Sequence, residues 1–186
     1  IPTSLINGYK LVNALPVVTA ASSATAVCEG NNVTLSGSGA STYVWSNGVT
    51  DAISFIPTTN TTYTVTGTDA NGCSKTATTS VVVNALPVVT AASSATAVCA
   101  GQTIALTANG ATNYTWTNGP STSTYTVNPS TNTTYTVEGL DNNNCFNTSS
   151  ITISVTANPT VSAIASSTAI CAGQTVTLTA NGATSY

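Results

Sequence analysis

The sequence predicts an all-β protein built from tandem sandwich modules of about 71–72 residues each. The segment NALPVVTAASSATAVC occurs at residues 13–28 and again, without a single change, at residues 84–99. A diverged copy, ANPTVSAIASSTAIC, occupies residues 157–171. Between the copies apolar residues alternate with Thr and Ser, which is typical of half-buried strands. An internal repeat with strand patterning therefore organises the whole chain.

Recurrent prolines define the length and the boundaries of the modules. Pro16, Pro87 and Pro159 follow one another at intervals of 71 and 72 residues. A unit of this size is just large enough to close its own core, so we expect consecutive domains rather than a continuous solenoid. We predict the last strand of a preceding module at residues 1–13, complete modules at 14–84 and 85–156, and the N-terminal part of a third module at 157–186.

The third module stops before its Trp and its later strands, so it cannot bury a core by itself. Two interpretations remain open. The favoured one is that the chain continues beyond residue 186, and the other is that strands from a neighbour complete the module.

The strands of the first module follow from period-two alternation and from the turn residues between them. Val33 and Leu35 share one face, as do Tyr43 and Trp45, because successive side chains of a strand point to opposite sides. Asn-Gly at 47–48 and the segment 69–72 read as turns. We predict strands at residues 17–20, 33–36, 42–46, 53–56 (Ile53 and Phe55 inward), 62–68 and 76–83.

The second module repeats this pattern with apolar replacements at the inward positions. Tyr125 and Val127 replace Ile53 and Phe55, and the strand at its end carries Ile151, Ile153 and Val155. About seven short strands separated by turns are typical of an immunoglobulin-like sandwich. We expect its core to contain Trp45, Trp116, Tyr63 and Tyr135, the two tyrosines acting as tyrosine corners.

The five cysteines predict one disulfide per complete module. In each module one Cys precedes the second strand and another lies in the turn after the strand of residues 62–68 or its counterpart. We pair Cys28 with Cys73 and Cys99 with Cys145, and expect Cys171 to have a partner outside residues 1–186. A zinc site is the rival interpretation, but the sequence has no His and no closely spaced Cys pair. Paired cysteines indicate an oxidising, extracytoplasmic setting.

Composition excludes several functional classes. Charged residues make up 4% of the chain, and with a net charge of −3 and only two Lys or Arg the chain has no basic surface for nucleic acid. Apolar residues never run on for the roughly 20 positions that membrane insertion of this segment would need. Without His or Arg we expect no catalytic site, no enzyme activity and no cofactor.

Two weaker kinds of site remain in the sequence. Asp69 and Asn71, like Asp141 and Asn143, offer oxygen ligands to calcium, but one carboxylate per turn is too few for tight binding and an Asx-type turn is the simpler interpretation. Asn60 and Asn132 lie in equivalent Asn-x-Thr triplets and are candidate glycosylation sites, together with the outward Thr and Ser residues.

A family resemblance rests on the segments CAGQTIALTANGATNYTWTNG and PSTNTTYTVEGLDNNNC. They resemble the Ig-like and PKD-like repeats of very large secreted surface proteins of Bacteroidota. The first module carries the same signature at Cys28, Gly30, Trp45 and the turn from Asp69 to Cys73. In the second module Asn144 stands in place of the turn Gly. The resemblance implies an extracellular, cell-surface stalk or adhesin, exported by the type IX secretion system, in attaching or gliding bacteria.

We therefore expect a non-enzymatic structural stalk of a cell-surface adhesin. Its partners would be neighbouring modules of the same chain, other copies laterally, and a surface polysaccharide or host ligand bound by another part of the protein. The first alternative is a subunit of a self-assembling extracellular fibre, because uncharged faces and strand edges favour association. The second is a carbohydrate-binding module, which would need exposed aromatic residues.

Overall fold

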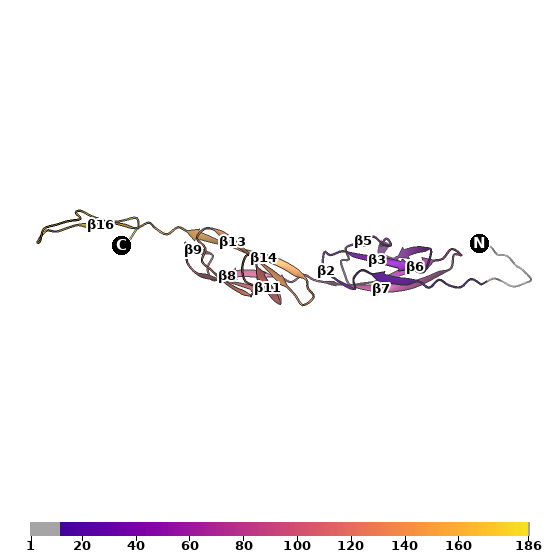
Figure 1. Ribbon diagram of the computed structural model, residues 1–186. Coiled ribbons are helices and arrows are strands. Elements are labelled where there is room, and N and C mark those ends of the chain that lie inside the picture. The colour runs from indigo at the N-terminus through magenta and orange to yellow at the C-terminus, as the bar shows by residue number, and fades with distance from the viewer. Residues whose placement is uncertain (1–11, 186) are drawn as a thin grey trace, which may run out of the picture. The chain divides into compact units, whose positions relative to one another are not determined.

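The computed structural model describes residues 12–185, and their secondary structure is strands apart from one short 3-10 turn, as the predicted fold class requires (Figure 1). The strand predicted before residue 13 lies almost entirely outside the described residues. The chain forms two compact units. The first contains the residues up to Val88 together with Leu140–Asn147, and the second contains Val89–Gly139 together with the residues from Thr148 onward.

Two sheets in the first unit enclose one core. The larger sheet has the order β2-β7-β6-β4 and the smaller one the order β1-β3-β5. Neighbouring strands are antiparallel, except that β2 runs parallel to β7. The strands are β1 Thr19–Ser22, β2 Ala26–Cys28, β3 Val33–Ser38, β4 Thr42–Trp45, β5 Ser54–Phe55, β6 Thr61–Thr68 and β7 Ser74–Asn84, with the 3-10 turn η1 Ser46–Gly48 after β4.

Alternation along the strands places the apolar side chains between the two sheets. On β3, Val33 and Leu35 are buried, and on β6 the buried positions are Tyr63, Val65 and Gly67. The threonines between them face outward, as the period of two requires. The core of the first module is completed by Val18, Trp45 and Val81.

Two details of the predicted strands are wrong. The first strand, predicted at residues 17–20, is β1 at Thr19–Ser22 and pairs with β3 in the small sheet, and an additional strand that was not predicted, β2 at Ala26–Cys28, lies on the edge of the large sheet. Ile53 does not face the core and is 59% exposed, because its amide closes a turn onto the carbonyl oxygen of Thr50 and β5 begins only at the next residue. Phe55 packs against the core as expected.

The second module builds the same two sheets, in the orders β11-β13-β14-β9 and β12-β10-β8. Again one pair is parallel, β14 with β9. Its buried residues include Ile104, Leu106, Trp116, Val137 and Ile153. The strands are β8 Thr90–Ser93, β9 Ala97–Cys99, β10 Ile104–Asn109, β11 Asn113–Trp116, β12 Thr124–Val127, β13 Thr133–Leu140 and β14 Phe146–Thr156.

The third module has two paired strands, β15 Ser162–Ala165 and β16 Leu178–Asn181. Val161 and Leu178, which are 58% and 74% exposed, correspond by the repeat to Val18 and Leu35, which are 9% and 0% exposed. Within residues 12–185 no second sheet covers β15 and β16, and an apolar strand face is buried only when a second sheet covers it.

One turn glycine recurs in all three modules because a side chain does not fit there. Gly39 has φ +87°, and a Cβ on it would lie 1.8 Å from the carbonyl oxygen of Val17. Gly182 has φ +98° and the same approach, 1.8 Å, to the carbonyl oxygen of Thr160. This turn therefore requires glycine for two reasons: the neighbouring backbone leaves no room for a Cβ, and φ is left-handed.

Candidate functional site at the cysteines of turn and linker

Cys28 is placed by the parallel pairing of β2 with the end of β7. It lies opposite Asn84, the last residue of β7, and the next amide, that of Glu29, donates to the carbonyl oxygen of Asn84 at 2.8 Å. β7 then leads into the linker with Pro87. Cys28 is therefore held at the end of the first module from which the chain departs toward the second.

Cys145 is placed by a turn that an aspartate closes. Oδ1 of Asp141 accepts hydrogen bonds from the amides of Asn143 and Cys145, both at 2.8 Å. The Asp141 amide donates to the Cys145 carbonyl oxygen at 2.9 Å. Asn144 has φ 59°, close to the φ of 80° at the corresponding Gly72. Since Asn tolerates the left-handed region, its replacement of the glycine leaves the turn unchanged.

A disulfide joins Cys28 to Cys145, with a Cα–Cα distance of 5.5 Å and a sequence separation of 117 residues. Both cysteines belong to the first compact unit, because the segment Leu140–Asn147 packs there. Cys145 is fully buried. The side-chain amide of Asn147 in the same unit donates to the carbonyl oxygen of Pro87 at 3.1 Å. A turn of the second module is thus incorporated into the first unit.

The predicted pairs Cys28–Cys73 and Cys99–Cys145 are wrong. Cys28 lies opposite the last residue of β7, whereas Cys73 directly precedes its first residue, Ser74. Eleven residues of strand separate the two ends, about 35 Å at roughly 3.3 Å per residue. A disulfide needs Cα atoms within about 7 Å. Cys99, opposite Thr156, and Cys145, before Phe146, lie at the two ends of β14 in the same way.

Three cysteines retain free thiols in residues 12–185: Cys73 is partly buried, and Cys99 and Cys171 are exposed. A signal for the observed pairing was present in the sequence. Each turn cysteine precedes the last strand of its module, predicted at residues 76–83 in the first one, and this strand ends at the linker, so the two cysteines of one module had to lie at opposite ends. Sequence analysis missed this because β2 was not predicted.

The calcium candidates form backbone-closing turns. Oδ1 of Asp69 accepts hydrogen bonds from the amides of Asn71 at 2.9 Å and Cys73 at 2.8 Å, as Asp141 does in the second module. Within residues 12–185 no group of three or more Cys, Asp or Glu side chains is arranged to hold a metal ion. The calcium interpretation stays an untested prediction, and the Asx turn accounts for the contacts that are present.

The two tryptophans offer no stacking face for a sugar. Trp45 is 5% exposed and Trp116 is 1% exposed. The phenol oxygens that bond to upstream backbone belong to Tyr43 and Tyr114, which donate to the carbonyl oxygens of Ala40 and Ala111, each at 2.7 Å. The predicted tyrosine corners at Tyr63 and Tyr135 are therefore misplaced: the tyrosines that make such bonds lie on β4 and β11, which neighbour β6 and β13 in the sheets. Tyr63 is buried, and Tyr135 packs against the core of the second module.

Burial affects the acidity of Tyr135. Desolvation raises the pKa of its phenol, and the neighbouring Tyr125 raises it further, while a hydrogen bond from Thr133 acts in the opposite direction. The rings of Tyr125 and Tyr135 meet edge to face at 6.1 Å.

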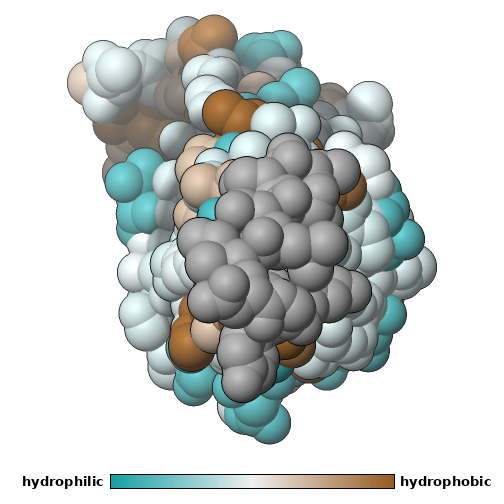
Figure 2. All heavy atoms as spheres, turned by 90° about the vertical axis from the view of Figure 1, so that its right-hand side faces the viewer, coloured by the Kyte–Doolittle hydropathy of each residue, from teal (hydrophilic) through white to brown (hydrophobic). Residues whose placement is uncertain are grey.

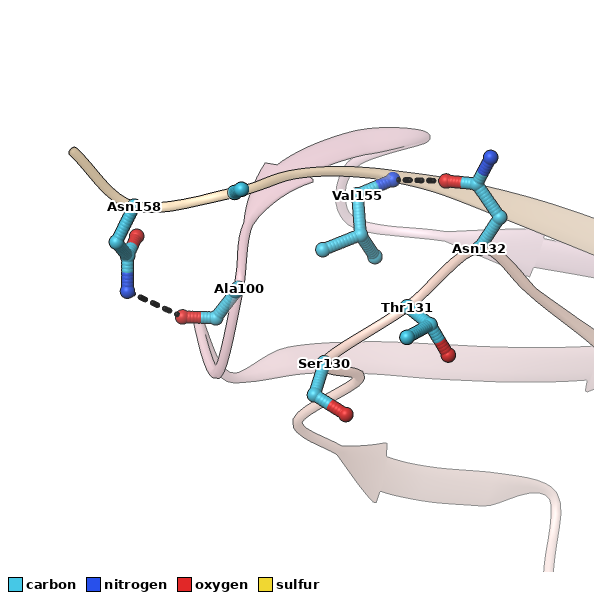
Figure 3. A pocket seen from close by; sticks show the side chains of 7 residues that line it. Ala100, Ser130, Thr131, Asn132, Val155 and Asn158 are labelled. Atoms are coloured by element: carbon cyan, nitrogen blue, oxygen red, sulfur yellow. Dashed lines mark hydrogen bonds between the residues drawn. The ribbon is translucent and has the colours of Figure 1, made fainter. Parts of the chain in front are cut away.

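Asn60 and Asn132 have a structural role whether or not they carry sugar. Oδ1 of Asn60 accepts a hydrogen bond from the amide of Val83, and Oδ1 of Asn132 accepts one from the amide of Val155, both at 2.7 Å. Asn60 directly precedes β6, and Asn132 directly precedes β13. Each side chain therefore adds one hydrogen bond to the ladder between its strand and β7 or β14. Figure 3 shows that the side-chain nitrogen of Asn132 points away from Val155.

The outward Thr and Ser residues pair across the strands of the large sheets. Thr62 and Ser80 bring their hydroxyl oxygens to 2.8 Å, and Thr134 and Thr152 do the same in the second module. In Figure 2 the coloured atoms are mainly pale or teal, with brown patches among them. The hydroxyl groups give this nearly uncharged chain a polar but neutral surface.

An open pocket of about 560 Å³ lies at the end of the second module, and its lining includes Ala100, the residue that follows Cys99 (Figure 3). The side-chain amide of Asn158 donates to the Ala100 carbonyl oxygen at 3.0 Å across its mouth. Ser130 and Thr131 come from the loop between β12 and β13. Its lining consists of Ala100, Ser130, Thr131, Asn132, Val155, Ala157 and Asn158.

Among residues 12–185 no helix is long and apolar enough to cross a membrane. No protein-family model and no curated protein matches the chain.

Solved structures similar to the chain include Ig-like and adhesin proteins. Murine CEACAM1b is 18% identical, with a TM-score of 0.34, over 75% of this chain and 100% of that chain. A calcium-stabilised adhesin of an Antarctic bacterium that binds ice is 19% identical, with a TM-score of 0.41, over 81% of this chain and 52% of that one. A 1.5-MDa bacterial ice-binding adhesin is 14% identical, with a TM-score of 0.41, over 82% and 70%. At these values the likenesses carry no conclusion about what this chain binds.

Proposed function

We propose that the chain is a non-enzymatic spacer segment of an extracellular, cell-surface adhesin. One observation carries the proposal: a disulfide joins a turn of the second module to the end of the first, in addition to the linker itself. Because the turn belongs to the first unit, the backbone passes between the two units three times, after Val88, Gly139 and Asn147. Such a connection suits a segment that must keep successive modules together under load.

The surface supports the same role. The tryptophans are buried, the turn carboxylates are engaged by backbone amides, and the outward residues are mostly uncharged hydroxyls. These features favour a spacer and leave ligand binding to another part of the protein. The resemblance to repeats of Bacteroidota surface proteins supports export by type IX secretion and a place in attachment or gliding.

The test is made in the cell that produces the protein. We expect antibodies against residues 14–156 to label intact cells. Deletion of modules should lower attachment in proportion to the length removed, and their replacement by the same number of unrelated Ig-like modules should restore it. Loss of attachment that equal-length replacement does not restore would show instead that these modules bind the ligand themselves.

A second candidate function is a subunit of an extracellular fibre. The observation that favours it is the nearly uncharged surface of the modules, whose outward hydroxyls, such as those of Thr62 and Ser80, carry no like charges that would keep copies apart. Strand edges of another copy could associate with this surface. The mass of the native polypeptide under denaturing, non-reducing and deglycosylated conditions distinguishes the two functions. A chain of hundreds of kilodaltons supports the spacer, and one near 18.5 kDa supports the fibre.

A further inference from the structure

The three free cysteines are internal copies of the two that are bonded. Cys73 corresponds to Cys145, since both end the turn that leads into the last strand of a module. Cys99 and Cys171 correspond to Cys28, since all three follow the repeated segment at the start of a module. We call the first kind turn cysteines and the second kind linker cysteines. The bonded pair consists of one of each, taken from consecutive modules.

The free turn cysteine is held in the same backbone geometry as the bonded one. Asp69 closes its turn by accepting from the amide of Cys73 at 2.8 Å, as Asp141 accepts from that of Cys145. Within each turn the Asp amide donates to the Cys carbonyl oxygen at 2.9 Å. Cys73 is therefore presented as Cys145 is, but it is partly buried where Cys145 is fully buried.

The free linker cysteine Cys99 is also held in the same backbone geometry as its bonded counterpart, Cys28. Cys99 lies opposite Thr156 at the end of β14, as Cys28 lies opposite Asn84 at the end of β7. After each of them an amide three residues on donates to the cysteine carbonyl oxygen at 3.0 Å, from Gln102 in one case and Asn31 in the other. Ala100, the residue that follows Cys99, also lines the open pocket together with Asn158.

We propose that Cys99 and its pocket receive the turn cysteine of a further module of this kind, and that Cys73 inserts into the equivalent site of another module. Each linker cysteine is then bonded to the turn cysteine of the module that follows it, so that disulfides connect the modules in series. This inference deepens the proposed spacer role and rests on it, because a spacer of many modules supplies the partner cysteines. Its tests measure disulfide bonds and do not depend on attachment.

The bond forms by oxidation of two thiols. Each thiol loses one proton and, between them, they give two electrons to a disulfide-bonded oxidant of the thiol–disulfide oxidoreductase class. One thiolate first attacks the oxidant to form a mixed disulfide, and the second displaces it. The products are the disulfide between the modules and the reduced dithiol form of the oxidant.

The first experiment is disulfide mapping of the native polypeptide after alkylation of free thiols. The segments CEGNN, CAGQTIAL, CAGQTVTL, DANGC and DNNNC distinguish the five cysteines by mass. We expect Cys28 linked to Cys145, and Cys73 and Cys99 each linked to a cysteine of the opposite kind in another module. Bonds within a module, or alkylated Cys73 and Cys99, would overturn the proposal.

The second experiment uses the 186-residue chain in a glutathione redox buffer. One variant, C73S/C171S, keeps only the free linker cysteine Cys99, and the other, C99S/C171S, keeps only the free turn cysteine Cys73. In an equal mixture we expect cross-linked heterodimers at least several-fold above the two homodimers, and D69A in the second variant should slow the cross-link severalfold. Heterodimers only twice as abundant as each homodimer, which is the statistical ratio, would overturn the proposal. The absence of any cross-link after full oxidation would overturn it too.

The two proposals fail in different ways. If mapping gives the expected pairs but equal-length replacement does not restore attachment, the disulfide series stands and the spacer role falls. If attachment follows length but Cys73 and Cys99 are free thiols in the native protein, the spacer role stands and the series falls.

Discussion

The indole Nε1 of Trp45 donates a hydrogen bond of 2.8 Å to Oδ1 of Asp51. The same oxygen accepts the amide of Gly37 at 2.8 Å, so one carboxylate satisfies two donors at the rim of the core. In the second module the indole of Trp116 donates instead to the backbone carbonyl oxygen of Thr122, at 3.1 Å. Equivalent tryptophans thus depend on a side chain in one module and on the backbone in the other.

We expect Asp51→Ala to destabilise the first module by about 2–3 kcal/mol, because it leaves the two donors without their acceptor. The matched control is Thr122→Ala, which keeps the carbonyl oxygen and should cost less than about 1 kcal/mol. Urea unfolding followed by tryptophan fluorescence measures both. Equal losses in the two variants would show that the indole hydrogen bond contributes little.

Gly67 packs directly against Val18. A Cβ on Gly67 would lie 2.6 Å from Cγ2 of Val18 and 2.9 Å from the Cβ of Ala40. Its φ lies outside the left-handed region, so Gly67→Ala tests packing alone, and we expect a loss of roughly 1–3 kcal/mol from overpacking. Val18→Ala makes room for the new methyl group. The double variant should therefore lose less stability than the sum of the losses in the two single variants. Simple additivity would contradict the contact between Gly67 and Val18.

The side-chain oxygen of Asn132 takes the place of a strand carbonyl for the amide of Val155. We expect Asn132→Ala to lower the stability of the second module by about 1 kcal/mol, measured by thermal unfolding of protein made without glycosylation. An unchanged melting temperature would count against this bond.

Glycosylation of Asn132 is tested separately with Thr134→Val, which removes the Asn-x-Thr triplet and keeps the asparagine. In protein from the producing cell this variant should lose the mass of one glycan if Asn132 carries it. Identical masses for the variant and the parent, after correction for the substitution, would remove Asn132 from the glycosylation candidates.

The raised pKa of the Tyr135 phenol predicts a loss of stability in alkali. In the unfolded chain this phenol ionises near its ordinary pKa of about 10, whereas burial keeps it neutral to a higher pH in the folded state. Its contribution to stability is therefore constant below about pH 10 and decreases as the pH rises from there through the folded pKa. Tyr135→Phe should show a weaker dependence on pH in this range when unfolding is measured from pH 8 to 12, and equal slopes would contradict the assignment.

The disulfide can be tested by counting thiols in the 186-residue chain. Under denaturing, non-reducing conditions we expect three reactive thiols per chain, those of Cys73, Cys99 and Cys171. Pairing within the modules would leave one. Cys28→Ser should raise the count to four by releasing Cys145, whereas Cys171→Ser should lower it to two, and any other pattern would contradict the observed bond.

Local pattern was enough to determine the fold class and the interior of each module. Alternation placed Val33, Leu35, Tyr63 and Val65 inward, and Trp45 follows the same rule, because the two faces of a strand are set by adjacent residues alone. The exact repeat carried this inference from one module to the next. The turns were also local, and the Asp69 and Asp141 turns close through hydrogen bonds within five residues.

What local pattern could not determine is which ends of the strands come together. Residues Ala26–Cys28 carry too little pattern to be recognised as a strand, and only their parallel pairing with the end of β7 places Cys28 at the linker. The cysteine partners, the partly buried acceptor Asp51 and the ladder role of Asn60 all depend on contacts between segments distant in the chain. Sequence determined the faces of the strands, and the tertiary structure decided the disulfide, because a bond that must close within about 7 Å is set by the assembled sheets and not by spacing along the chain.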